Sequence, residues 1–339
     1  APCSLPVVEL PGSSEEFVLL SSHYDSWHEG VTDNATGNAL CLALATLFSG
    51  QRLKRGLRVA FWPGPSNARY GGSTWYADHY RSELLGHCVA HINVDSPGCV
   101  GGTRLVVNAS GAESLDWLNQ AIIATTGKPA ERVTAIGKGA DQSFWGLGIP
   151  LHFALREVPE QRQSPSPGSG GGWWWHTEED TLDKVDENHL WREFAIHRHW
   201  LESLLLENTL PLDAQQYLAQ MDDALADLQN EIDPAFSLSP LRERLSSLEK
   251  LITEKTCKLP SLAEATGVWH RARYRAGDDF HPDLSYHGGA FPGLQRLCGF
   301  RRQQCSERHG LMLETQFIRQ RDRICELLAR SESILRQSV

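Results

Sequence analysis

Several patterns that would place a chain in a particular class are missing from this sequence. The eight cysteines never form a C-x-x-C pair, so a zinc site built from cysteines is not expected. No apolar stretch is long enough to span a bilayer, and there is no long run of basic residues. A formal net charge of −10 also argues against nucleic acid or an anionic membrane as the main partner.

The first ten residues, APCSLPVVEL, lack the basic start and the apolar core of a signal peptide. Cysteines such as Cys41 and Cys88 lie in apolar patterns and are typical of core thiols in a reducing compartment. The expected location is therefore the cytoplasm, with secretion as the alternative if a leader has been removed.

The first part of the chain alternates strands and helices. Hydrophobic residues make up 41% and charged residues 22% of the 339 residues, as in an ordinary soluble globular protein. Strand patterns that alternate with helix patterns predict an α/β fold with a mixed, largely parallel sheet flanked by helices. We expect strands over 17–20, 57–62, 89–94, 104–107 and 149–154, and helices over 73–85 and 112–125. Between the first two strands we expect a DNATGN turn that starts at Asp33, followed by a helix from Ala39 that ends before Gly50.

The second part of the chain is mostly helical in pattern. Apolar residues recur at helical spacing over 217–228, 241–252 and 317–335. We therefore expect an α/β domain over residues 1–210 and a mostly helical segment over 211–339. The helical segment would pack on the sheet or form a homodimer contact.

His23-Tyr24-Asp25 is the first candidate site, directly after a predicted strand. Residues i and i+2 of an extended segment point the same way, so the His23 imidazole can bind a metal while Asp25 orients it. The alternative is a structural histidine near a strand end.

Asp33 and Asp95 are two further candidate site residues, and both carry a carboxylate. Asp33 stands in GVTDNATG at a loop-to-helix junction, where it is either a helix N-cap or a carboxylate that bridges two metal ions. Asp95 follows the predicted strand that contains Ile92. Open α/β sheets bind ligands at the carboxyl ends of their strands, so Asp95 is well placed for function.

His176 lies between a Pro/Ser/Gly-rich loop, QRQSPSPGSGGG, and the acidic run TEED. It is a candidate metal ligand, and the alternative is a helix-capping segment with Thr177 or Asp180 as the cap. The preceding Trp173, Trp174 and Trp175 form a lid or substrate wall, or else an aromatic anchor for the loop. As a wall, Trp174 and Trp175 would favour apolar or aromatic groups.

The order of these motifs resembles the zinc aminopeptidase family, metallopeptidase family twenty-eight, which includes glutamate carboxypeptidase, the transferrin receptor and glutaminyl cyclase. The motifs are HYDS, GVTDNATG, a Gly-Gly-Ser turn, INVD, GADQSFWGLGIP and HTEEDTLDKVD, between about Val8 and Leu190. The resemblance implies an aminopeptidase-like fold. It also places Asp141 near the site, among the residues expected to contact substrate.

The resemblance also implies a ligand set. One metal ion would be held by His23, Asp33 and Asp95, and a second by Asp33, a glutamate and His176. Asp25 would be the partner that orients His23. Zinc is the expected ion, in one or two copies, although manganese or iron also accepts such ligands.

The sequence departs from this family where two adjacent glutamates are expected, one as general base and one as metal ligand. The segment over 63–70 reads PGPSNARY and contains no acid. The glutamate positions fall on Pro65-Ser66 or on Ser66-Asn67, and neither Ser66 nor Asn67 can take a proton near neutral pH. The second metal is left with two protein ligands, whereas the first keeps three.

Other groups are candidates to replace the missing acids. They are His28 and Glu29 in the loop before Asp33, and Glu178 and Glu179 after His176. For each of them the alternative is a solvated loop charge.

Three functions remain in competition. The first is a metal-dependent hydrolase of peptide N-termini or small amides that uses metal-bound water at an atypical site. The second is an inactive pseudo-peptidase that binds a peptide or a protein. The third, a cyclase-like transferase, also needs an acid at the missing position. We favour the hydrolase, because four of the five ligands are kept and carboxylates crowded together without a metal would repel one another.

Overall fold

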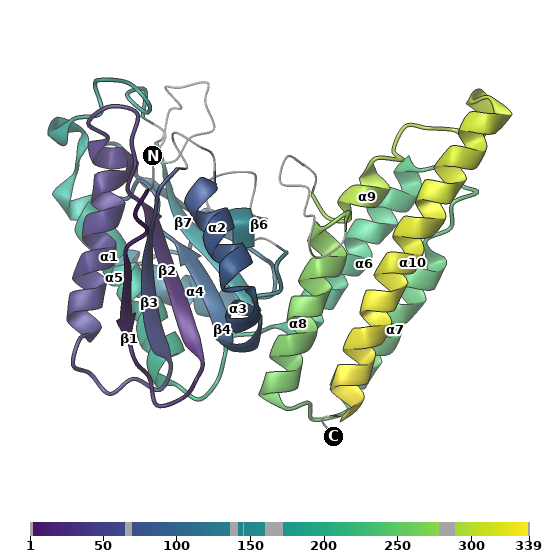
Figure 1. Ribbon diagram of the computed structural model, residues 1–339, viewed down its shortest axis with the longest axis horizontal. Coiled ribbons are helices and arrows are strands. Elements are labelled where there is room, and N and C mark those ends of the chain that lie inside the picture. Colours follow the sequence, from purple (N-terminus) through teal and green to yellow (C-terminus); the bar gives the residue numbers. More distant parts are fainter. Residues whose placement is uncertain are drawn as a thin grey trace. The chain divides into compact units, whose positions relative to one another are not determined.

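The computed structural model consists of two compact units, the α/β unit and the helical unit (Figure 1). The α/β unit comprises Ala1–Phe144 and Leu151–Pro211, and the helical unit comprises Trp145–Pro150 and Leu212–Val339. The structure describes residues 3–64, 70–135, 142–144, 146–159, 172–277 and 289–337.

Within these residues, the α/β unit contains a seven-stranded sheet of order β1-β3-β2-β4-β7-β5-β6. The four central strands are parallel to one another, β1 runs antiparallel to β3, and β5 runs antiparallel to β7. The predicted mixed sheet is therefore confirmed. The strands are β1 (Val7–Leu10), β2 (Phe17–His23), β3 (Gly56–Trp62), β4 (Cys88–Asn93), β5 (Arg104–Ala109), β6 (Arg132–Ala135) and β7 (Leu151–Val158).

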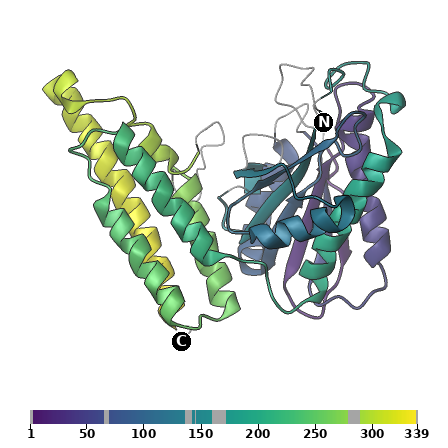
Figure 2. The same ribbon diagram turned by 180° about the vertical axis from the view of Figure 1, so that it is seen from behind.

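Helices cover both faces of this sheet. On one face lie α1 (Thr36–Phe48), α4 (Leu115–Thr126) and α5 (Glu187–Leu206), and Figure 2 brings α4 and α5 to the front. The other face carries α2 (Gly71–His79) and α3 (Arg81–His87) (Figure 1). Because both faces are covered, all seven residues of β2 are buried.

Aromatic side chains fill the space between the sheet and its helices. Trp200 of α5 and Trp117 of α4 both pack against Phe153 of β7. On the opposite face, Trp62 of β3 packs against Tyr76 of α2. Trp62 and Trp200 are among the largest fully buried side chains, as expected for tryptophans that form a core.

Two predicted helices differ from the observed ones. The predicted helix over 73–85 is divided into α2 and α3, because Tyr80 between them has ψ 20° and leaves the helical conformation. The helix predicted from Ala39 begins earlier, at Thr36, so the turn before it is shorter than predicted; Asp33 and Asn34 in the preceding segment η1 (Val31–Ala35) have non-helical dihedral angles. The short edge strand β6 carries no apolar run and was not predicted.

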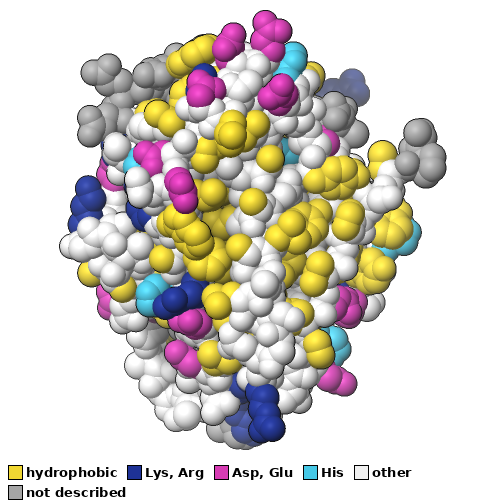
Figure 3. Space-filling model, turned by 90° about the vertical axis from the view of Figure 1, so that its left-hand side faces the viewer, with side chains coloured by type: hydrophobic (Ala, Val, Ile, Leu, Met, Phe, Trp, Pro, Cys, Tyr) yellow, Lys and Arg dark blue, Asp and Glu magenta, His cyan; other side chains and the backbone are white. Residues whose placement is uncertain are grey.

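The outer side of α1 exposes apolar residues. The helix, TGNALCLALATLF, has no charged residue, and Leu42 and Leu47 are 51% and 38% exposed. Trp191 of α5 is 60% exposed. Figure 3 shows hydrophobic side chains gathered on this side of the α/β unit.

In its described residues, the helical unit contains four longer helices. Of these, α10 packs against α7 and α8, and α6 packs against the same two. The residues predicted from helical spacing face inward; Tyr217, Met221 and Leu225 are fully buried. None of the helices described is both long and apolar enough to cross a membrane. The helices are α6 (Ala214–Glu231), α7 (Ser239–Glu254), α8 (Leu259–Tyr274), the short α9 (Pro292–Gln295) and α10 (Glu307–Gln337).

The loop over 146–150 belongs to the helical unit, where it lies against α8. His270 Nε2 donates to the carbonyl of Pro150 at 2.9 Å, and Arg271 Nε donates to Leu147 at 3.1 Å. At Gly267 the Gly148 carbonyl approaches so closely that a Cβ atom would lie 2.1 Å from it, so only glycine fits there.

Candidate metal centre

Three of the predicted site residues meet at the carboxyl edge of the parallel strands. His23 is the last residue of β2, and Asp95 follows the end of β4 by two residues. Asp33 lies in η1, between β2 and α1. Because β2 and β4 are parallel neighbours, their carboxyl ends bring these side chains together.

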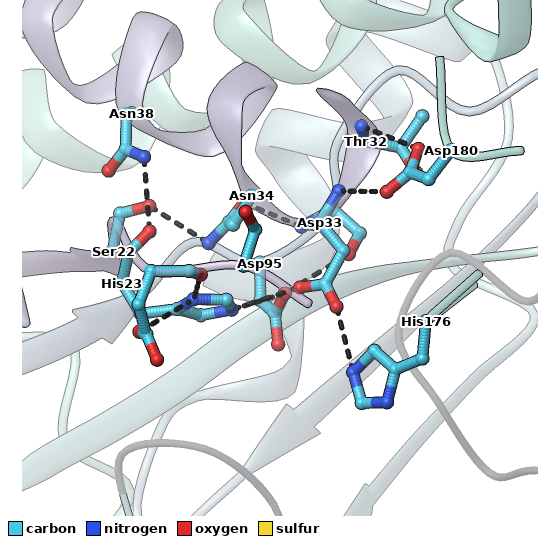
Figure 4. Close-up of polar contacts among 12 residues, drawn as sticks. Ser22, His23, Thr32, Asp33, Asn34, Asn38, Asp95, His176 and Asp180 are labelled. Carbon is cyan, nitrogen blue, oxygen red and sulfur yellow. Dashed lines mark hydrogen bonds and ion pairs between the residues drawn. The ribbon is translucent and has the colours of Figure 1, made fainter. Parts of the chain in front are cut away.

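The distances within this group fit a metal site (Figure 4). His23 Nε2 lies 3.0 Å from Asp33 Oδ1 and 3.6 Å from Asp95 Oδ1. One ligand atom from each of the three residues lies within 4.8 Å of the others. Two ligands of a tetrahedral zinc ion lie roughly 3.3–3.6 Å apart. The donor set therefore fits one such ion with little movement.

The other ring nitrogen of His23 faces Asp25. Nδ1 lies 2.9 Å from the main-chain oxygen of Asp25 and 3.6 Å from its carboxylate. The carbonyl can only accept, so Nδ1 carries the proton and Nε2 turns its lone pair towards the carboxylates when the ring is neutral. Asp25 thus orients the ring mainly through its backbone.

Charge at the centre also favours a cation. Burial lowers the pKa of His23, but the surrounding carboxylates raise it, and the pKa lies well above its ordinary value. The carboxylates therefore favour a positive charge at the His23 ring. A metal ion would supply that positive charge in place of a proton.

Asp180 holds the backbone that carries Asp33. Its buried carboxylate accepts from Thr32 N at 2.9 Å, Thr32 Oγ1 at 2.7 Å and Asp33 N at 3.0 Å. From the sequence, Asp180 is expected only as a helix cap. Nothing in the sequence relates it to a loop almost 150 residues away.

Asn34 fixes the same loop from the other side. Its Nδ2 donates to Ser22 Oγ at 2.9 Å and to the carbonyl of Val94 at 3.0 Å, and its Oδ1 accepts from Ser96 N at 3.0 Å. Asn34 thus ties the Asp33 loop to both neighbouring strand ends. It was not predicted as a site residue, although it directly follows Asp33 in the DNATGN motif.

His176 also reaches this centre. Its Nε2 lies 2.9 Å from Asp33 Oδ2, the oxygen that faces away from His23 (Figure 4). Its ring stacks on Trp175, with ring centroids 3.5 Å apart and planes at 21°. The ring centroid of Trp27 lies 5.5 Å from that of His176. All four predicted ligands are therefore brought together, with Asp33 between the two histidines.

The neighbouring tryptophans divide into two kinds. Trp174 is 5% exposed and donates from Nε1 to Thr32 Oγ1 at 3.1 Å, so it anchors the loop to the Asp33 segment. Trp173 is 48% exposed, and its ring faces Lys184. Contact of Trp174 and Trp175 with substrate stays a prediction.

Several predicted residues do not join the group. His28, Glu29, Glu178 and Glu179 are exposed, as solvated loop charges are. Ser66, Asn67 and Asp141 lie outside the described residues.

Arg156 was not singled out by sequence reasoning, although it lies beside the centre. Its Nη1 is 3.9 Å from Asp95 Oδ2, and its Nε donates to Asn108 Oδ1 at 2.9 Å. It comes from β7, which is parallel to β4, so its position follows from the sheet order.

Comparison with known proteins identifies the family of the chain. The sequence profile of peptidase family M28 matches residues 7–201, or 195 of 339 residues. A probable glutamate carboxypeptidase, VP8, from Zea mays is 22% identical over 381 residues, which cover 95% of this chain and 50% of that protein. Transferrin receptor protein 1 from Gallus gallus is 26% identical over 102 residues, which cover 28% of this chain and 13% of the receptor.

Among solved structures, an aminopeptidase from Aneurinibacillus sp. strain AM-1 has a TM-score of 0.51 at 20% identity. The match covers 61% of this chain and 49% of that chain, and it shows the shared fold. The chain thus spans about half the length of the Zea mays protein and of this aminopeptidase. With the family profile matching more than half of its residues, the chain belongs to peptidase family M28.

Proposed function

We propose that this chain is a metal-dependent hydrolase of peptide N-termini or small amides. The observation that carries this proposal is the convergence of His23, Asp33 and Asp95, whose ligand atoms lie within 4.8 Å of one another. Three protein ligands with an open fourth position are the usual arrangement of a catalytic zinc site. Membership of the peptidase family gives the reaction class.

Each residue of the centre has a distinct task. His23 Nε2, Asp33 Oδ1 and Asp95 Oδ1 would hold the ion, with zinc as the proposed metal and manganese or iron as alternatives. When bound, such an ion activates water and polarises a carbonyl group. Asp25 and Asp180 keep the ligands in place through His23 Nδ1 and the backbone of Asp33.

The proposed hydrolase is expected to be slow. The segment over 63–70 contains no acid, so the general base that the family resemblance implies is missing. General acid–base catalysis contributes about 10²–10⁴-fold to a rate. Turnover lower by this order, compared with an aminopeptidase that has its glutamate, is the expected consequence.

A pseudo-peptidase that binds a peptide or a protein is the second candidate. The same missing acid favours it, because a metal centre without a base is suited to binding. The helical unit would then serve as an interaction region. Whichever candidate holds, we propose that this unit forms a homodimer contact, with the exposed Leu311, Met312 and Ile318 of α10 as apolar contact residues.

Turnover measured with and without metal tests the hydrolase against the pseudo-peptidase. Aminoacyl anilides and short peptides would be assayed after removal of metal and again after addition of zinc or manganese. We expect turnover that depends on metal, is lost in Asp33→Asn and is unchanged in Asp116→Asn, which alters an exposed carboxylate on α4. A chain that binds metal but turns over no substrate of the panel would favour the pseudo-peptidase, and a chain that binds no metal would contradict the hydrolase.

A further inference from the structure

We infer that this chain binds one metal ion, and that His176 serves it as a hydrogen-bond donor to Asp33 rather than as a ligand of a second ion. Trp27 and Trp175 hold the His176 ring for this purpose. The inference rests on the proposed function, because the single ion is the one placed between His23, Asp33 and Asp95.

Among the described residues, the donors beside Asp33 do not make up a second site. A second ion beside Asp33 would have Asp33 Oδ2 and His176 Nε2 as ligands. The segment over 63–70, where the family resemblance places the third ligand, contains no Asp, Glu, His or Cys. In the described part of the chain, the group of three potential ligands around Asp33 does not include His176. Two protein ligands are too few for a tight zinc site.

The two oxygens of Asp33 have separate partners. Oδ1 lies 3.0 Å from His23 Nε2, on the side of the proposed ion, whereas Oδ2 lies 2.9 Å from His176 Nε2. The second distance is ordinary for an N–H···O hydrogen bond. A donor on Oδ2 fixes the rotation of the carboxylate and presents Oδ1 to the ion. Such outer partners typically change metal affinity by about 10–100-fold.

Aromatic contacts supply the restraint on His176 that a second ion would otherwise provide. His176 has φ 65°, a region that residues other than glycine rarely adopt, and its side chain is 33% exposed. Trp175 stacks on the ring, and Trp27 approaches from the separate loop after β2. Trp27 is 53% exposed, and its ring centroid lies 5.5 Å from that of His176.

The test is the number and affinity of bound ions in the full chain. Metal-free protein would be titrated with zinc in competition with a chromophoric chelator, and with cobalt to follow its absorption bands. We expect one ion per chain in the unchanged protein and in His176→Gln, since the glutamine amide can still donate to Asp33. In His176→Ala we expect one ion bound about 10–100-fold more weakly.

Trp27→Ala tests the aromatic restraint. It should weaken zinc binding in the same direction as His176→Ala but by a smaller factor. Trp191→Ala is the matched control, because Trp191 of α5 is similarly exposed at 60% and its ring contacts Phe194 and Glu187 of the same helix. Zinc affinity should be unchanged in this control. Thermal unfolding of both variants without metal shows whether either is misfolded.

The outcomes separate this inference from the proposed function. Two ions in the unchanged protein and one in His176→Gln would overturn the inference and leave the hydrolase proposal standing. Equal weakening by His176→Gln and His176→Ala would also overturn it, because the donor role would then be wrong. If no variant binds zinc or cobalt, both proposals fail together.

Discussion

Asp180 holds the Asp33 loop through three hydrogen bonds, to Thr32 N, Thr32 Oγ1 and Asp33 N. Replacing it with alanine leaves the backbone donors of Thr32 and Asp33 buried without their acceptor. Each such loss costs about 1–3 kcal/mol. We expect Asp180→Ala to lower the free energy of unfolding by roughly 2–5 kcal/mol and to weaken zinc binding, as measured by urea unfolding and metal titration.

Glu179→Ala is the control for this substitution, because Glu179 is exposed and adjacent in sequence. It should change stability by no more than about 0.5 kcal/mol. Equal stability losses in both variants would mean that the effect comes from the segment as a whole and not from the buried carboxylate.

At the scale of single residues, the order of the motifs was sufficient to predict which four side chains meet, but not which residues hold them in place. His23, Asp33, Asp95 and His176 come together as the motifs predicted. Asp180 could not be predicted, because its hydrogen bonds to the Asp33 loop join segments that are distant in sequence and only the tertiary fold relates them.

At the scale of elements, α1 has one buried and one exposed apolar side, and the two sides should respond differently to mutation. Leu44 is fully buried, whereas Leu42 is 51% exposed. Removing a buried leucine side chain costs about 2–5 kcal/mol, because it loses both transfer free energy and packing. We expect Leu44→Ala to lower the free energy of unfolding by this amount, measured by urea denaturation.

Leu42→Ala provides the comparison on the same helix with the same chemical change. We expect it to change the free energy of unfolding by no more than about 0.5 kcal/mol, because the side chain already contacts water. A large loss in Leu42→Ala would show that the exposed face of α1, visible in Figure 3, is covered in solution.

The elements themselves were predictable where an apolar pattern was long or buried. The strand β2 and the helices α6, α7 and α10 follow their patterns closely. The division between α2 and α3 could not be predicted, because Tyr80 leaves the helical conformation without a glycine or proline to mark the break. The edge strand β6 has mostly exposed residues, so hydrophobic periodicity gives no signal there.

At the scale of the whole molecule, the sequence pattern showed a helical second part but not the membership of the loop over 146–150. This loop precedes β7 in the chain, yet it lies in the helical unit. Its anchors, the bonds from His270 to Pro150 and from Arg271 to Leu147, span more than 100 residues. Contacts of that range leave no periodic signal in the sequence.

Both units carry a buried neutral histidine, which makes the whole molecule sensitive to acid. Burial lowers the pKa of His197 in the α/β unit to about 4, and burial lowers the pKa of His270 in the helical unit to about 4. The unfolded value is about 6.5. Since the folded pKa is the lower one, stability is fully present above pH 6.5 and decreases as the pH falls towards 4.

Protonation of each histidine should therefore lower the free energy of unfolding by up to about 3 kcal/mol between pH 6.5 and pH 4. In His270→Gln the amide can still donate to Pro150 and accept from Tyr217, the two partners of the imidazole, but it cannot be protonated in this range. We expect this variant to be somewhat less stable at pH 7, and its stability should fall less steeply towards pH 4, as followed by urea unfolding at several pH values. If the slope is unchanged, protonation of His270 does not contribute to acid unfolding, and His197 in the other unit becomes the histidine to replace next.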